Sequence, residues 1–155
     1  QEIKRQEKGD QAASLLGELP KGLPALVAAY RVQEKAGAVG FDWPDADGAL
    51  AKIREEADEI EAEMGGDTDP QLAREVGDLL FAMVNLARHL GVDPERELRV
   101  ATHRFRDRFH HIERRLAERG SSPAQASLEE MDRLWDEAKA LALPPAPPPA
   151  PGVTS

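Results

Sequence analysis

Hydrophobic residues recur at steps of three and four along most of the chain, which is the spacing of one face of an α-helix. The pattern is clearest over residues 46–64, where the apolar positions form a narrow stripe of Leu50, Ile53, Ala57, Ile60 and Met64. The same reasoning, with glycine and proline as breaks, predicts further helices over residues 24–40, 70–90, 94–120 and 128–141. No stretch has the alternation of a strand. The sequence therefore predicts an all-α fold, a four- to five-helix bundle with short loops.

Two of the expected helices carry extended apolar faces. Residues 76–87 are apolar on nearly every side, so this helix is expected at the centre of the bundle or under a partner subunit. The helix over 94–120 has an expected core face made of Leu98, Ala101, Phe105, Phe109, Ile112 and Leu116.

The two ends of the chain differ in composition from the helical part. Residues 1–22 are polar and broken by glycine and proline, which predicts a frayed helix and a linker. Gln1 opens this segment instead of a methionine, which suggests a fragment of a longer protein. Residues 23–141 are the expected helical domain, and residues 142–155 are an expected disordered, polyproline-like tail.

Composition narrows the classes of function. The chain has no cysteine, which excludes disulfides, zinc–thiolate sites and thiol nucleophiles and agrees with a cytoplasmic location. No apolar run approaches the roughly 20 residues that a membrane helix needs. The net charge of −9 makes duplex nucleic acid a poor partner. A small anionic substrate stays open if bound cations supply positive charge.

The helix over 46–64 carries an acidic cluster. Glu56, Glu59 and Glu63 share a stripe with Lys52 beside the apolar seam, whereas Glu55 points toward water. Taken alone, such a run reads as a solvated helix face.

A second acidic pair, Glu75 and Asp78, lies one turn apart on the next helix. Asp78 precedes an apolar run, and burying a lone charge costs several kcal/mol. A salt bridge to Arg74 or a hydrogen-bonded structural aspartate is the alternative reading. The short loop before this helix makes it antiparallel to the first, so the two acidic pairs can face each other.

Four clustered carboxylates repel one another unless a cation intervenes, and all-oxygen ligands select Mg²⁺ or Mn²⁺. The expected ligands are Glu56, Glu59, Glu75 and Asp78. The absence of a Glu-x-x-His pattern at these positions argues against a di-iron site.

Two further pairs have the i, i+4 spacing of one helix face. Arg104 and Arg108 could reach an anion held at such a metal, or they could form a basic surface. Trp135 and Lys139 read by default as a core tryptophan with a surface lysine.

The acidic pairs in this order resemble the motif of the MazG family of nucleoside triphosphate pyrophosphohydrolases, Glu-Glu-x-x-Glu followed by Glu-x-x-Asp. The motif stands here as EEADE at 55–59 and EVGD at 75–78. The resemblance runs from residue 23 to residue 139 and includes VGFDWP at 39–44 and LEEMDRLWDEAK at 128–139. It is closest to the C-terminal domain of the two-domain bacterial form, with residues 1–22 as the linker between domains.

The resemblance implies Mg²⁺-dependent hydrolysis of ribo- or deoxynucleoside triphosphates to the monophosphate and pyrophosphate. It also implies an all-α homodimer of the type found in all-α pyrophosphohydrolases, with a role in cleaning the nucleotide pool. Whether one nucleotide, such as dUTP or an oxidised nucleotide, is preferred stays open.

The resemblance assigns roles by position. The metal ligands would be Glu56, Glu59, Glu75 and Asp78. As a separate mechanistic hypothesis, Glu55 or Glu59 orients a metal-bound water, and the expected catalytic residues are Glu55, Glu56 and Glu59. Phosphate contacts would come from Lys52, Arg104 and Arg108, and the nucleotide site would be lined by Trp135 and Lys139. The family commonly has lysine where Arg104 stands, so the charge is kept but the geometry differs. Asn85 could read a base edge or make an interhelical hydrogen bond.

A competing interpretation is a non-catalytic, metal-binding helical dimerisation module of a larger two-domain protein. Retention of all four expected ligands argues against it, and metal-dependent turnover of a nucleotide would discriminate between the two.

Overall fold

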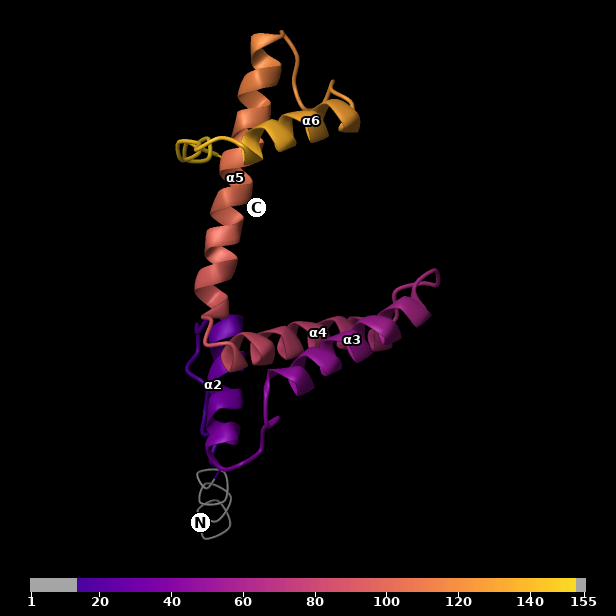
Figure 1. The fold of residues 1–155 in the computed structure, drawn as a ribbon, viewed down its shortest axis with the longest axis vertical. Helices are drawn as coiled ribbons and strands as arrows, with labels where there is room; N and C mark the ends of the chain where they lie inside the picture. The colour runs from indigo at the N-terminus through magenta and orange to yellow at the C-terminus, as the bar shows by residue number, and fades with distance from the viewer. Residues whose placement is uncertain (1–13, 153–155) are drawn as a thin grey trace. The chain divides into compact units, whose positions relative to one another are not determined.

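The computed structural model describes residues 14–152, which contain five α-helices and no strand beyond one isolated bridge between Met64 and Gly66. The helices are α2 (Ala25–Ala38), α3 (Ala46–Glu63), α4 (Pro70–His89), α5 (Pro94–Glu118) and α6 (Leu128–Lys139) (Figure 1). The predicted all-α class is confirmed, and each helix ends within two residues of its predicted boundary. Residues 1–13 of the expected linker and residues 153–155 of the expected tail lie outside the described residues.

Side-chain caps explain why three of the helices begin where they do. The Asp45 carboxylate accepts from the backbone N–H groups of Asp47 and Gly48, at 3.0 and 3.3 Å, at the start of α3. Asp69 accepts from Leu72 N at 2.8 Å before α4, and Ser127 accepts from Glu130 N at 3.2 Å before α6. Each cap satisfies a backbone donor that the helix leaves unpaired and contributes about 1 kcal/mol.

The chain divides into two compact units, residues 1–95 and residues 96–155. In the first unit, α4 packs along α3 and also against α2 (Figure 1). Gln33 of α2 is buried and donates from Nε2 to the carbonyl oxygen of Phe81 at 2.9 Å, which ties α2 to α4. Ala49 of α3 and Ala82 and Val84 of α4 supply the buried apolar contacts.

One apolar face of α4 is left without a cover in this unit. Leu80, Phe81 and Met83 are each about half exposed, at 53%, 48% and 53%. Of the two expectations for α4, a central position and burial by a partner subunit, the first does not account for these exposed side chains within the first unit. Met64, the last position of the predicted α3 stripe, is also exposed because it lies just past the end of the helix.

In the second unit, α6 packs on the C-terminal half of α5. Their core is Ile112, Leu116 and Leu134, with Met131 and Trp135 packed against it. Two residues of the predicted core face of α5, Leu98 and Phe105, are instead more than half exposed. The reason is length, since α6 has 12 residues against the 25 of α5 and covers only part of it.

The Pro/Ala-rich segment after α6 makes two hydrogen bonds with α5. The backbone N–H of Ala146 donates to Asp107 Oδ1 at 2.6 Å, and Arg106 Nη2 donates to the carbonyl oxygen of Pro147 at 3.0 Å.

None of the described helices combines the length and hydropathy that a membrane crossing requires.

Candidate metal centre and nucleotide-contact residues

The candidate metal centre lies along the α3–α4 hairpin. The loop of residues 64–69 joins the two helices, which run side by side in opposite directions (Figure 1). Desolvation and, next, the negative charge of Glu75, near the start of α4, raise the pKa of Glu63, at the end of α3, so the two carboxyl groups lie close to each other. In an antiparallel pair this contact places Glu59 at the level of Leu79, next to Asp78, and Glu56 one turn further along. Glu59 and Asp78 therefore lie at nearly the same level on facing helices, with Glu56 about one turn beyond them and Glu75 about one turn before them.

Two of the predicted ligands are buried carboxylates, one on each helix. Glu56 is 4% exposed and Glu75 is 6% exposed. Lys52 Nζ lies 3.0 Å from Glu56 Oε1, and Gln71 Nε2 donates to Glu75 Oε1 at 3.1 Å. The second carboxylate oxygen, Oε2, of both Glu56 and Glu75 is buried without a hydrogen-bond partner within the described residues. The same holds for Oε2 of Glu63. A buried carboxylate oxygen without a partner is costly, and a bound cation would be one way to satisfy these three atoms.

The carboxylates on α3 and α4 repel one another, and this repulsion contributes to the raised pKa values of Glu59 and Glu63. The pKa of Glu59 is raised, mainly by the negative charge of Glu56, then by desolvation and by Glu55 and Glu75. The pKa of Glu63 is raised by desolvation first, then by Glu75. Glu59 thus feels acidic groups on α3 and α4 at once, and a divalent cation would relieve this repulsion.

Glu63 is a further carboxylate beside the expected metal ligands. It lies on the same stripe of α3 as Glu56 and Glu59, and that stripe was the available signal. The family motif ends at Glu59, so Glu63 was not assigned a role.

Asp78 lies one turn after Glu75 and is exposed. Asp78 therefore does not carry the cost of a buried charge, and the buried carboxylates are those of Glu56 and Glu75. Its proposed alternative partner, Arg74, donates to Gln71 Oε1 at 3.2 Å. Glu55 is exposed, as expected, and lies 3.4 Å from Lys52 Nζ.

The oxygen-only donor set fits a hard cation such as Mg²⁺ or Mn²⁺. In the part of the chain that is described, no three acidic or histidine side chains are yet placed to coordinate one ion together. The centre is accordingly two buried carboxylates with three acidic neighbours.

Lys52 lies at the edge of this centre. Its Nζ contacts both Glu55 and Glu56, and its pKa is raised, chiefly by the hydrogen bond with Glu56. The ammonium group is therefore held in its charged form beside the carboxylates, which is where a phosphate contact would be required.

Asn85 lies on α4, two turns after Asp78. Its Oδ1 accepts from Arg88 Nη2 at 2.7 Å. The partner is thus one turn along the same helix, and the interhelical bond considered as the alternative is not the contact that the structure contains.

The remaining predicted contact residues belong to the second unit. The guanidinium carbon of Arg108 lies 5.4 Å from the ring centroid of Trp135, within cation–π range. The Trp135 ring also contacts Phe105, with 5.3 Å between centroids. Arg104 is exposed, and Lys139 Nζ lies 3.9 Å from Asp136 Oδ1. Arg108 and Trp135 are therefore brought together, and Arg104 and Lys139 face solvent.

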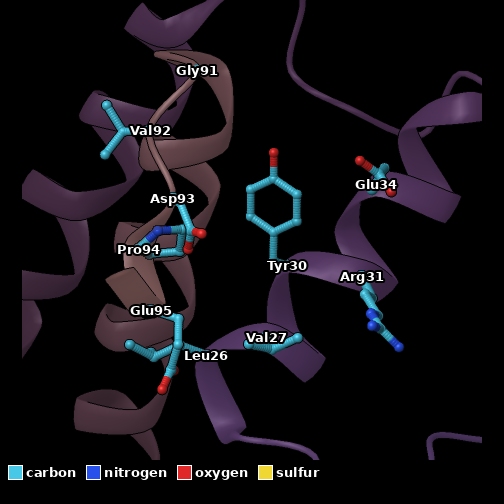
Figure 2. A pocket seen from close by; sticks show the side chains of 10 residues that line it. All are labelled: Leu26, Val27, Tyr30, Arg31, Glu34, Gly91, Val92, Asp93, Pro94 and Glu95. Atoms are coloured by element: carbon cyan, nitrogen blue, oxygen red, sulfur yellow. The ribbon is translucent and has the colours of Figure 1, made fainter. Parts of the chain in front are cut away.

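A pocket of about 360 Å³ lies elsewhere in the first unit, between α2 and the turn from α4 to α5. Figure 2 shows Tyr30 projecting from α2 toward this turn, with Val92 and Pro94 on the opposite side. None of the predicted site residues lines it, so this pocket is separate from the carboxylate centre.

Comparison with known proteins agrees with the motif. Residues 46–112, which contain all the candidate carboxylates, match the MazG nucleotide pyrophosphohydrolase domain. The chain is 44% identical over 140 residues to the nucleoside triphosphate pyrophosphohydrolase/pyrophosphatase MazG of Thermotoga maritima, covering 90% of this chain and 53% of that protein. It is 40% identical over 142 residues to the nucleoside triphosphate pyrophosphohydrolase of Escherichia coli K12, covering 90% and 54%.

A third relative is the uncharacterized protein YabN of Bacillus subtilis, 44% identical over 140 residues, of which the chain covers 29%. The chain thus spans about half the length of the first two relatives and less than a third of this one. The part of the chain that carries the acidic motif on the α3–α4 hairpin, residues 46–112, thus matches the MazG nucleotide pyrophosphohydrolase domain.

Proposed function

We propose that this chain hydrolyses ribo- or deoxynucleoside triphosphates to the monophosphate and pyrophosphate, with Mg²⁺ or Mn²⁺ as the cofactor. Two of its relatives bear the name nucleoside triphosphate pyrophosphohydrolase. The proposed role is removal of unwanted nucleotides from the pool, by a homodimer.

One observation supports the proposal most strongly. Glu56 and Glu75 are buried on facing helices, and each keeps one buried carboxylate oxygen without a partner. A protein that needed these groups only for stability would pair both oxygens or use apolar side chains, because buried unpaired charge is destabilising. The arrangement suits a centre that is completed by a cation.

In the proposed centre, Glu56, Glu59, Glu75 and Asp78 hold the metal, and Glu63 is close enough to assist. When bound, the cation would neutralise phosphate charge and make a water molecule more acidic. Glu55 or Glu59 orients the attacking water and accepts its proton. The raised pKa of Glu59 brings it closer to the range in which a carboxylate is an effective base.

Positive side chains supply the phosphate contacts in this proposal. Lys52 is already held beside the carboxylates at 3.0 Å from Glu56. Arg104 and Arg108 would stabilise charge on the departing pyrophosphate, since arginine binds phosphate oxygens through two parallel donors. Trp135 offers a ring face for the base, with Lys139 nearby on α6. Asn85 would contact the edge of the base.

The homodimer is supported by the exposed apolar face of α4. Leu80, Phe81 and Met83 are each about half exposed on a helix that carries two proposed metal ligands. Such a surface on a soluble helical protein is typical of an interface.

A panel of ribo- and deoxynucleoside triphosphates with Mg²⁺, with products separated by chromatography, tests the reaction. We expect monophosphate and pyrophosphate in equal amounts, lost on addition of EDTA. Release of inorganic phosphate and a nucleoside diphosphate would contradict the proposed bond cleavage. Turnover of no nucleotide would favour the non-catalytic metal-binding module instead.

A further inference from the structure

Asn85 and Asp78 lie on the same face of α4. Seven residues are almost two full helical turns, so the side chains point in nearly the same direction about 10 Å apart. Asn85 is partly exposed. A nucleoside triphosphate is longer than this separation, so phosphates held at the carboxylates leave the base free to reach the Asn85 amide.

Arg88 determines which way this amide points. Its Nη2 lies 2.7 Å from the Asn85 side chain. Arginine has only donors, so the amide atom that faces it must be the oxygen. The Nδ2 group, which carries two N–H donors, is then directed away from Arg88.

The Asp42 carboxylate holds Arg88 in place. Arg88 Nη2 donates to Asp42 Oδ1 at 2.6 Å, in the connector before α3, and His89 Nε2 lies 2.9 Å from the same oxygen. The Asp42 carboxyl has its pKa lowered to about 2, chiefly by the hydrogen bond from Arg88, so it stays ionised at neutral pH.

Helix α2 closes the remaining space around this pair. A Cβ atom added at Gly37 would come within 3.0 Å of Asp42 Oδ2 and 3.4 Å of Arg88 Nη1. The pair therefore has little room to rearrange, and the orientation of Asn85 is built into the fold.

We propose that Arg88 is a positioning residue that fixes Asn85 as a hydrogen-bond donor toward the substrate, so that the chain prefers bases with a carbonyl over bases with an amino group. This inference rests on the proposed function. An exocyclic amino group at C6 of a purine or C4 of a pyrimidine is a donor, and two donors facing each other leave both groups unpaired. A carbonyl at the same position accepts the Asn85 bond.

Two matched substrate pairs test this preference. dITP differs from dATP by a carbonyl in place of the amino group at C6, and dUTP differs from dCTP in the same way at C4. We expect kcat/KM to favour the carbonyl member of each pair by about tenfold or more. Asn85→Asp presents only acceptor oxygens and should reverse the preference toward the amino members.

Variants of Arg88 separate positioning from a merely structural role. Arg88→Met allows the amide to rotate, so the carbonyl-to-amino ratio should fall toward one. Arg88→Lys keeps a donor beside the Asn85 oxygen and should retain the ratio. A structural role alone would lower turnover of all four substrates alike and leave the ratio unchanged.

Turnover without a carbonyl preference, or a ratio unchanged in Arg88→Met, would overturn the inference and leave the proposed function intact. If Arg88→Met does not fold, the reversal expected for Asn85→Asp decides the matter, and an unaltered preference there also overturns it. Turnover of none of these four nucleotides, nor of any other in the ribo- and deoxynucleoside triphosphate panel, would instead refute the proposed function and the inference with it.

Discussion

Asp42 Oδ1 lies 2.6 Å from Arg88 Nη2, which joins the connector before α3 to the last turn of α4. Both side chains are largely buried, with 20% and 15% exposed. His89 contacts the same oxygen. Forty-six residues separate the two partners, so this contact fixes the path of the chain from α2 into the α3–α4 hairpin.

The contact between Asp42 and Arg88 should make the free energy of unfolding depend on pH in the acid range. The Asp42 pKa is lowered from 3.8 to about 2, so the folded protein binds this proton less tightly than the unfolded chain. The contribution is therefore present above the ordinary value of 3.8 and is lost as the pH falls toward 2. After allowance for solvent screening it is on the order of 1 kcal/mol. Urea unfolding across this range should show a shallower loss in Asp42→Asn, and identical slopes would contradict the assignment.

Neutralising one carboxylate of the centre should stabilise the metal-free protein. Glu63→Gln removes a charge that repels Glu75, so its melting temperature in EDTA should exceed that of the unmodified chain. The increase in melting temperature on adding Mg²⁺ should be smaller in the variant. Glu61→Gln is the control, since Glu61 is an exposed glutamate on the same helix. An equal rise in both variants would trace the effect to net charge.

The core of the second unit should depend strongly on Leu116, which is fully buried. Leu116→Ala leaves a cavity between α5 and α6 and should cost about 3 kcal/mol of that unit's unfolding free energy. Trp135 packs on this core and reports its unfolding by fluorescence in a Trp43→Phe background. Leu128→Ala, at a residue 70% exposed, should change the free energy by less than about 0.5 kcal/mol. Similar losses in both variants would show that this core is not the stabilising element.

Two helical glycines should respond differently to alanine. A Cβ at Gly77 of α4 meets nothing within 4 Å, so Gly77→Ala should stabilise the protein by about 1 kcal/mol. A Cβ at Gly48 of α3 would lie 3.0 Å from the Trp43 ring, so Gly48→Ala should gain less. Unfolding free energies measured in parallel check this order, and a larger gain at Gly48 would contradict it.

The helices were predictable from the sequence because helical periodicity and caps are local. Asp45 and Asp69 are N-caps of α3 and α4, and each accepts a hydrogen bond from a backbone N–H in the first turn of its helix. The burial of particular faces was less predictable, since it depends on the length of the neighbouring helix. Phe105 fits the apolar stripe of α5 and contacts Trp135 of α6, yet it is still more than half exposed.

The candidate centre was predictable in its residue types and less so in its geometry. Spacing placed Glu56 and Glu75 on facing helices, and both prove to be buried. The proximity of Glu63 to Glu75 depends on the register of the hairpin, which no local pattern encodes. The Asp42–Arg88–Asn85 chain of contacts likewise joins segments that sequence periodicity treats separately.

The central claim is that the α3–α4 carboxylates bind a divalent cation, and a Mn²⁺ titration followed by electron paramagnetic resonance tests it most directly. We predict saturable binding to the unmodified chain, weakened at least about tenfold in Glu56→Gln and in Glu75→Gln. Glu61→Gln should bind as the unmodified chain does. Binding that is unaffected by either buried substitution, or is equally weakened in Glu61→Gln, would contradict the account.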